Sequence, residues 1–284
     1  MMKKVRSEQF DYIAFCDQDD YWLPEKLNRA TRVLNLFSSR EKAGQGDPPG
    51  IDDELPLLYC GKPQLTDKEL SPIGEDMKRN IRPGFANALV ENIVTGCTTV
   101  LNRSMYEMIL KFLPEYCIMH DWWMYLVASC FGRVLYDETP MIYYRQHENN
   151  VMGIDSSRIK ELKHRTQKYK SRKSNISMQA EEFLRLLKKQ GIQEGKGEQE
   201  RQYDKGEYIS LEEWQQSLRA SEMGDAVIRV SRKEPIGASR KRTYLLANYK
   251  KSGNRLRLVF GKVMYRQRKM DDLIFRILFL LGLR

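Results

Sequence analysis

The stretch DYIAFCDQDDYWLPEKL, residues 11–27, decides the fold class of this chain. Its first part, residues 12–16, is a short continuous apolar run, which is typical of a strand buried on both faces of a sheet. An acidic turn follows at residues 17–20, and Pro24 then stands where the first turn of a helix accepts proline. Apolar residues recur after it at helical spacing, namely Leu27, Ala30, Val33, Leu34 and Phe37. The order of strand, acidic turn and helix predicts an α/β fold.

The same alternation of strands and helices continues along the first half of the chain. We expect strands at residues 57–60, 98–101, 134–136 and 141–144, and helices at residues 86–94, 105–112 and 122–131. The polar, proline-containing segment 61–84 is too long for a simple connection, so we interpret it as a flap over a site. Together these elements predict an open mixed sheet with a ligand at the carboxyl edge of its strands.

Charge divides the chain into two regions. Residues 1–150 contain 17 Lys and Arg against 22 Asp and Glu, a net charge of −5, whereas residues 151–284 contain 31 against 16, a net charge of +15. This asymmetry indicates regions with different partners. We therefore divide the chain into an α/β portion, residues 1–153, and a basic, mainly helical region, residues 154–284, with a mobile insert near residues 191–206.

Composition excludes several classes of protein. With 41% hydrophobic and 30% charged residues, the chain is neither a disordered tail nor a collagen-like fibre. The five cysteines are scattered and form no CxxC pair, which argues against a zinc ribbon or a disulfide framework and favours a reducing cytosol. A predicted strand follows the basic start of the chain, where a signal peptide would have its apolar region. We expect a cytoplasmic protein.

The C-terminal region carries two open interpretations. The apolar run at residues 273–283 is interrupted by Arg276 and is shorter than the roughly 20 residues that cross a bilayer. Residues 255–284 could lie in the interface of an anionic membrane, at the inner face of the cell membrane, or form a terminal helix that packs on the protein's own core. Nucleic acid is not an expected partner, because no RNP, helix-turn-helix or zinc motif accompanies the basic residues.

The acidic turn is a candidate metal site. Carboxylates as close as Asp17, Asp19 and Asp20 repel one another, so a site that keeps them ionised usually holds a cation. Oxygen ligands in an open turn suit Mg²⁺ or Mn²⁺, which in turn would bind a diphosphate. The alternative interpretation is an acidic turn that only favours the start of a helix. The strand before the turn and Trp22 after it make that alternative less attractive.

A second cluster, residues 119–123, is a candidate for base catalysis. Asp121 precedes an apolar helix and stands beside two tryptophans, which would exclude water and raise the pKa of its carboxyl group. The alternative is an N-cap aspartate with the tryptophans in the core. A metal phosphohydrolase is disfavoured, because only two further histidines, His147 and His164, are present.

Two further motifs contain polar or small residues near predicted strand ends. At residues 144–150, Arg145 could bind phosphate through paired hydrogen bonds, and His147 could complete a metal shell. In the segment 95–98, Gly96 would let a sugar or an acceptor approach the backbone closely. A tight turn is the simpler interpretation of that glycine.

These motifs, in the order DQDDYWLPEKL (17–27), NIVTGCT (92–98), HDWW (120–123) and YRQH (144–147) with Asn150, resemble those of bacterial family 2 glycosyltransferases, in particular the rhamnosyltransferase-like branch that builds surface polysaccharides. The resemblance covers about residues 8–153. It implies a GT-A fold and an inverting transfer from a nucleotide-diphosphate sugar to a saccharide or lipid-linked acceptor.

The resemblance also implies roles for individual residues. Asp17 and Asp19 would bind the metal ion with the diphosphate, His147 would be a further metal ligand, and Asp121 would be the base that deprotonates the acceptor hydroxyl. The residues expected to contact substrate are Asp20, Trp22, Asn92, Thr95, Gly96, Cys97, His120, Trp122, Trp123 and Arg145.

One departure from the family concerns the region before the first motif. The family has a βαβαβ nucleotide-binding half there, and each βαβ unit takes about 30 residues, whereas only ten residues precede this strand. Gly61 also stands where relatives tend to carry an acidic residue. We therefore expect an N-terminally truncated catalytic portion. The alternative is an inactive remnant that acts as a membrane or protein interaction module.

Overall fold

The computed structural model describes residues 10–43, 55–73, 81–146, 175–192, 227–231, 234–248 and 269–280, with single residues and short stretches between 216 and 267. Its elements are β1 (Tyr12–Ala14), β2 (Tyr21–Trp22), α1 (Lys26–Ala43), β3 (Leu57–Gly61), β4 (Gln64–Thr66), α2 (Phe85–Ala88), the 3-10 helix η4 (Gly96–Thr98), β5 (Val100–Asn102), α3 (Arg103–Lys111), α4 (His120–Phe131), β6 (Arg133–Asp137), β7 (Ile142–Arg145), α6 (Asn175–Lys189), β8 (Ile228–Val230), α9 (Ile236–Ala247) and α11 (Lys269–Leu280).

The strands form two mixed sheets. The larger sheet has the order β1-β5-β3-β6-β8, in which β3 and β6 are parallel and the other neighbours are antiparallel. The smaller sheet has the order β2-β7-β4. The mixed α/β architecture agrees with the prediction from the sequence, and it is compatible with a glycosyltransferase-like fold.

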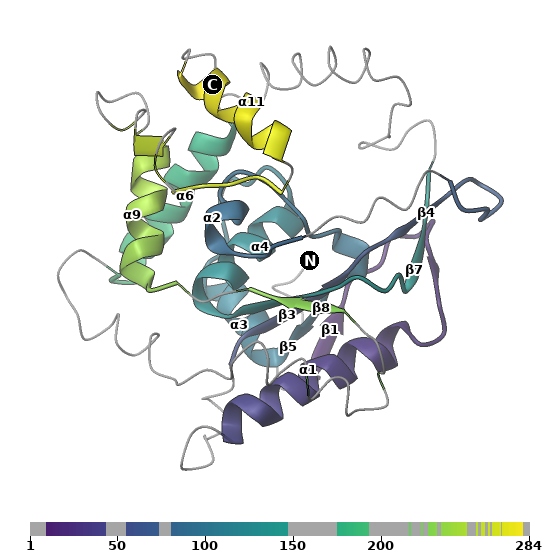
Figure 1. Ribbon diagram of the computed structural model, residues 1–284. Helices are drawn as coiled ribbons and strands as arrows, with labels where there is room; N and C mark the ends of the chain where they lie inside the picture. Colours follow the sequence, from purple (N-terminus) through teal and green to yellow (C-terminus); the bar gives the residue numbers. More distant parts are fainter. Residues whose placement is uncertain are drawn as a thin grey trace.

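Helices cover both faces of the larger sheet (Figure 1). Leu57 and Tyr59 of β3 pack with the apolar side of α1, whereas Leu58 and Cys60 pack in the larger core with α3 and α4. This alternation follows from the strand period of two, because successive side chains point to opposite faces. β3 and β6 are buried at every residue, as strands with helices on both faces must be.

The structure corrects two details of the sequence interpretation. β1 is only half-buried, and among the described strands it lies at one end of the larger sheet, so it is not the doubly buried strand that its apolar run predicted. The predicted helix at residues 86–94 is reduced to α2, Phe85–Ala88. A turn follows at residues 89–90, and the helix does not resume beyond it because the Asn92 side chain bonds the backbone of Val94, which favours a turn over a helix.

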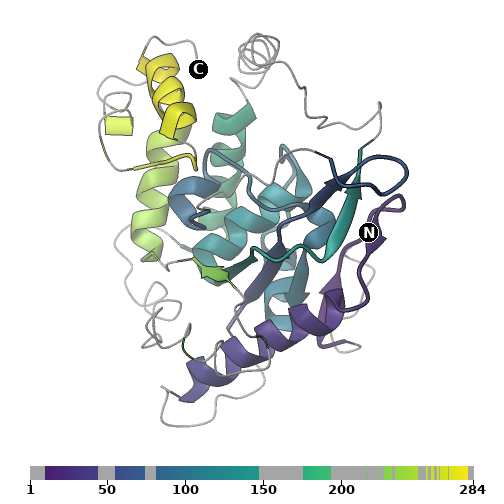
Figure 2. The ribbon, with the colours of Figure 1, turned by 45° about the vertical axis from the view of Figure 1, so that its right-hand side comes forward.

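The basic region is integrated with the α/β portion. β8 pairs with β6 at the end of the larger sheet, a strand that the sequence pattern did not predict. α6, α9 and α11 lie on the side opposite α1 (Figures 1 and 2), and Phe183, Leu246 and Phe275 from these helices belong to the larger core. Of the insert predicted near residues 191–206, only Gly191 and Ile192 belong to the described residues.

The C-terminal helix α11 has features of both interpretations of the tail. Phe275 is buried in the larger core, as a docked terminal helix requires. Leu273 and Ile277 are about half exposed, at 51% and 46%. Within the part of the chain that the structure describes, no helix combines the length and apolar character needed to cross a membrane.

Candidate functional site

The acidic turn between β1 and β2 lies against η4. The ligand atoms of Asp17, Asp20 and Cys97 all lie within 4.8 Å of one another. Asp17 is exposed, Asp20 is half-buried and Cys97 is buried. The chain therefore joins the two sequence motifs, residues 17–27 and 92–98, at one point of the fold.

Asp20 is the polar centre of this group. Its Oδ1 accepts a hydrogen bond of 3.3 Å from the backbone N–H of Arg145, whereas its Oδ2 is buried and has no hydrogen-bond partner among the described residues. Burial raises the pKa of the Asp20 carboxyl group, although a hydrogen bond from the Cys97 thiol and the N–H of Arg145 oppose the shift. The repulsion from Asp17 and Asp19 adds to the rise. A cation bound at Oδ2 would compensate the Asp20 carboxylate for the water that it loses on burial. It would also reduce the repulsion of Asp20 by Asp17 and Asp19.

The donor set fits a hard divalent cation. Mg²⁺ and Mn²⁺ prefer carboxylate oxygens and complete their coordination with water or substrate phosphate. Asp17 and Asp20 supply such oxygens, and the orphaned Oδ2 of Asp20 is a ready ligand. Burial and the neighbouring carboxylates raise the pKa of the Cys97 thiol, so this group is neutral in the metal-free site.

The other predicted metal ligands take different places. Asp19 follows Asp17 in the same turn but is not a member of the group formed by Asp17, Asp20 and Cys97. His147 lies outside the described residues. The pairing of Asp17 with Asp19 therefore stays a prediction, and the structure adds Asp20 as a second candidate partner for Asp17.

The candidate base, Asp121, lies in the first turn of α4. It is 5% exposed, and the N-cap of α4 is Met119, so Asp121 is not the capping residue that the alternative interpretation assumed. Its Oδ1 accepts the backbone N–H of Trp122 at 2.7 Å. Burial raises the pKa of the Asp121 carboxyl group, while the N–H of Trp122, the charge of His120 and hydrogen bonds from Asn92 and Gly96 oppose the rise. These contacts hold an aspartate whose proton affinity is higher than usual.

Gly96 permits the close approach of η4 to the start of α4. A Cβ atom at this position would lie 3.0 Å from Nε2 of His120 and 3.7 Å from Cβ of Asp121. Any side chain would therefore push against the imidazole ring. The absence of a side chain at Gly96 lets η4 pack closely against α4, so the tight turn lies next to the candidate base, Asp121.

The two tryptophans next to Asp121 are core residues. Trp122 is 4% exposed and donates from Nε1 to the carbonyl of Ala88 at 2.6 Å, and Trp123 is 2% exposed and donates to the carbonyl of Phe112 at 2.8 Å. This placement agrees with the core alternative for the indole rings. Their predicted contact with substrate is not tested by the structure.

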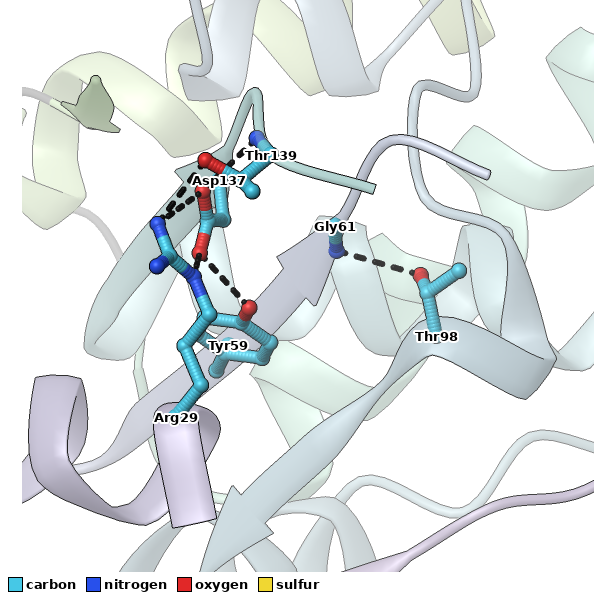
Figure 3. Close-up of polar contacts among 6 residues, drawn as sticks. All are labelled: Arg29, Tyr59, Gly61, Thr98, Asp137 and Thr139. Atoms are coloured by element: carbon cyan, nitrogen blue, oxygen red, sulfur yellow. Dashed lines mark hydrogen bonds and ion pairs between the residues drawn. The ribbon is translucent and has the colours of Figure 1, made fainter. Parts of the chain in front are cut away.

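Arg145 and Thr95 form hydrogen bonds with other residues of this chain. The Arg145 guanidinium donates from Nη1 to the carbonyl of Lys68 at 2.9 Å, so it connects β7 to the turn after β4. The carbonyl of Thr95 accepts from the N–H and the hydroxyl of Thr98. The hydroxyl of Thr98 also accepts the N–H of Gly61 at 3.2 Å, which ties the end of β3 to η4 (Figure 3).

A buried ion pair fixes α1, whose first turn adjoins the acidic turn. Arg29 of α1 donates from Nε and Nη2 to the carboxylate of Asp137 at 2.6 and 3.1 Å. The hydroxyl of Tyr59 and the N–H of Thr139 donate to the same carboxylate at 2.8 Å each (Figure 3). The sequence interpretation missed this network, because its members lie on three elements that are far apart in the chain.

Lys26, the first residue of α1, is a further residue that the sequence interpretation missed. It is 2% exposed, and its Nζ lies 3.4 Å from the centroid of the Trp22 ring. The spacing of Trp22 and Lys26 within the motif was the available signal, but lysine is almost never buried without a partner, so the sequence favoured an exposed side chain.

Comparisons with known proteins give one relationship at the level of sequence. The chain is similar to the dTDP-rhamnosyl transferase RfbG of Shigella flexneri, with 29% identity over 170 residues. The match covers 55% of this chain and 50% of that protein, so the chain spans about half the length of this curated relative. No family model and no solved structure matches the chain. The similarity supports a glycosyltransferase-like relationship.

Proposed function

We propose that this chain carries the catalytic portion of an inverting, metal-dependent glycosyltransferase of family 2 with a GT-A-like fold. It would transfer a sugar from a nucleotide-diphosphate donor to a saccharide or lipid-linked acceptor in cell-surface polysaccharide synthesis. The single observation that carries the proposal is that two distinct acidic centres flank one short segment. The Sγ atom of Cys97 lies within 4.8 Å of the carboxylates of Asp17 and Asp20, and the backbone of the adjacent Gly96 forms a hydrogen bond with Asp121.

The two centres suit the two halves of a displacement reaction. The acceptor hydroxyl must lose a proton as its oxygen attacks the anomeric carbon, and the bond from that carbon to the diphosphate oxygen must break. Asp121 would accept the proton, and its raised pKa makes it a better base than an exposed aspartate. A bound Mg²⁺ or Mn²⁺ would supply charge neutralisation for the leaving diphosphate. Asp17 with Asp19 or Asp20 would hold that cation.

The name of the relative points to a donor to test first. That relative is a dTDP-rhamnosyl transferase, so we propose a dTDP-sugar as the donor class. The experiment is release of dTDP from dTDP-rhamnose by the purified chain with Mn²⁺ or Mg²⁺, with and without a glycan acceptor. Failure of the chain to bind dTDP in the presence of either cation would favour the alternative, an inactive remnant with an interaction role.

Removing one carboxylate should reveal which residues hold the cation. We expect Asp17→Asn and Asp20→Asn to weaken Mn²⁺-dependent binding of dTDP by more than about 10–100-fold. That range is the typical cost of removing a group that only supports a metal ligand, and a direct ligand should cost more. Asp19→Asn is the matched comparison, because it removes the same charge from the same turn. Calorimetric titration of dTDP at fixed Mn²⁺ measures all three. If Asp20→Asn and the unmodified chain bind dTDP equally well, Asp20 is not a metal ligand, and Asp17 and Asp19 remain the proposed pair.

We also propose that residues 255–284 contact an anionic membrane surface. The exposed pair Leu273 and Ile277 lies one turn apart on α11, and the exposed cations Lys269 and Arg257 belong to the same region. Apolar burial and cation attraction would add together at such a surface. The surface would bring the site close to lipid-linked acceptors.

Charge placed on the exposed face of α11 should abolish this contact. The double variant L273D/I277D is expected to reduce co-sedimentation with anionic vesicles at least tenfold, since each half-exposed side chain would lose about half of the roughly 1.5–3 kcal/mol that full burial contributes, and each new carboxylate would be repelled by the anionic surface. Its melting temperature should change little, because both side chains are half exposed. Unchanged vesicle binding by the double variant would show that α11 serves only the core, where Phe275 lies.

A further inference from the structure

Lys26 is a buried ammonium without a hydrogen-bond partner. Its side chain is 2% exposed, and its Nζ donates to no acceptor among the described residues. It also makes no ion pair with a described carboxylate. Burying a cation costs several kcal/mol unless hydrogen bonds or opposite charge compensate for the lost water. Burial lowers the pKa of the Lys26 ammonium group to about 8, so the group is still charged at neutral pH, and an anion bound nearby would stabilise it.

The position of Lys26 indicates where such an anion would lie. The ammonium group is held over the face of Trp22, which stabilises it in part through the ring quadrupole. Cys97 lies close enough to Lys26 to oppose the lowering of its pKa by burial. Cys97 is in turn within 4.8 Å of the carboxylates of Asp17 and Asp20. Lys26 therefore lies in the neighbourhood of the candidate metal site, at the start of the helix that follows the acidic turn.

We propose that Lys26 is a fixed cation that favours a nucleoside diphosphate over a free divalent cation at the acidic turn. This inference rests on the proposed function. Lys26 is a positioning residue, because its Nζ is buried and would act on the phosphate charge through space rather than by contact. The Trp22 ring and the start of α1 hold the ammonium in place, so little reorganisation accompanies binding.

The charge balance of the site predicts opposite effects of Lys26 on the binding of the metal ion alone and of the metal ion with a diphosphate. Three carboxylates and the two ionised phosphate groups of a nucleoside diphosphate ester carry more negative charge than one divalent cation neutralises. A lysine charge nearby lowers the energy of that anionic complex. The same charge repels Mn²⁺ or Mg²⁺ when either binds alone. Lys26 should therefore weaken binding of the metal ion and strengthen binding of the metal with the diphosphate.

The test is the variant Lys26→Met, which keeps the length and the contact with Trp22 but removes the charge. We expect dTDP to bind this variant about tenfold more weakly than the unmodified chain at saturating Mn²⁺. Mn²⁺ alone should bind it as tightly or more tightly, and Lys26→Arg, which keeps the charge, should restore dTDP binding. Calorimetry measures both ligands, and thymidine, which has no phosphate, serves as the control ligand.

Each outcome of this experiment decides the inference. Weaker binding of both Mn²⁺ and dTDP by Lys26→Met, together with weaker binding of thymidine, would overturn it in favour of a purely structural role. Unchanged dTDP binding would also overturn it while leaving the proposed function intact. If the unmodified chain binds no dTDP, the proposed function fails and the inference fails with it. Should Lys26→Met not fold, Lys26→Gln gives the same comparison, because it also removes the charge.

Discussion

Replacing Asp121 by asparagine is expected to reduce sugar transfer by about 10²–10⁴-fold, the usual cost of losing a general base. The amide keeps the shape of the side chain but cannot take up the proton of the acceptor hydroxyl. Affinity for dTDP with Mn²⁺ should stay within a few-fold, because the acidic turn holds the diphosphate. Initial rates with a dTDP-sugar and a glycan acceptor, together with calorimetry, separate the two quantities.

The pH profile adds a second readout for Asp121. Burial raises the pKa of its carboxyl group, and the base must be ionised to act. Transfer should therefore decline on acidification at a higher pH than an ordinary aspartate would allow, and Asp121→Asn should remove this decline. Glu115→Gln, which changes an exposed carboxylate before α4, is the matched control and should retain the profile. Survival of transfer within a few-fold in Asp121→Asn would show that another group is the base.

Removing the Asp137 carboxylate is expected to have the largest effect on stability. Asp137→Ala should lower the free energy of unfolding by about 3–5 kcal/mol, the typical cost of breaking a buried ion pair on one side. The Arg29 charge and the Tyr59 hydroxyl would remain in the interior without their acceptor. Urea unfolding followed by circular dichroism measures the change.

The neighbouring ion pair provides the control for Asp137. Glu138 pairs with Arg229 between β6 and β8, but both side chains are about one-third exposed, at 31% and 35%. Pairs of this kind contribute about 0–1 kcal/mol. Glu138→Ala should therefore be several-fold less destabilising than Asp137→Ala. Similar losses in the two variants would mean that the network of Figure 3 is not the dominant tie between α1 and the sheet.

The sequence predicted those elements whose pattern is local. The helical spacing after Pro24 corresponds to α1, and the apolar run at residues 57–60 corresponds to β3. β1 has an equally apolar sequence, but its burial depends on which strands pair with it, and periodicity does not contain that information. β8 was missed for the same reason, because a three-residue strand gains its stability from pairing with β6.

The candidate site shows the same division between local and distant information. The sequence placed the acidic turn after a strand, and the structure agrees; it placed Asp121 just before an apolar helix, whereas the structure puts it inside the first turn of that helix, α4. It could not predict that Cys97 would lie close to Asp17 and Asp20, because the two motifs are about 80 residues apart in the chain. Nor could it predict a buried Lys26, since burial of lysine depends on the Trp22 ring that covers it.

The order of strands in the larger sheet has a consequence for how the chain acquires its structure. β1 pairs with β5, β3 pairs with β6, and β6 pairs with β8, so each partner is separated by a long stretch of chain. Sheets built from such distant pairings fold slowly, because the entropy of closing long loops opposes them before any pairing stabilises the chain. During synthesis β3 leaves the ribosome well before β6, so the edge of β3 that pairs with β6 stays unpaired until β6 has been made. We therefore expect the apolar segment of β3, residues 57–60, to be prone to non-native contacts during synthesis.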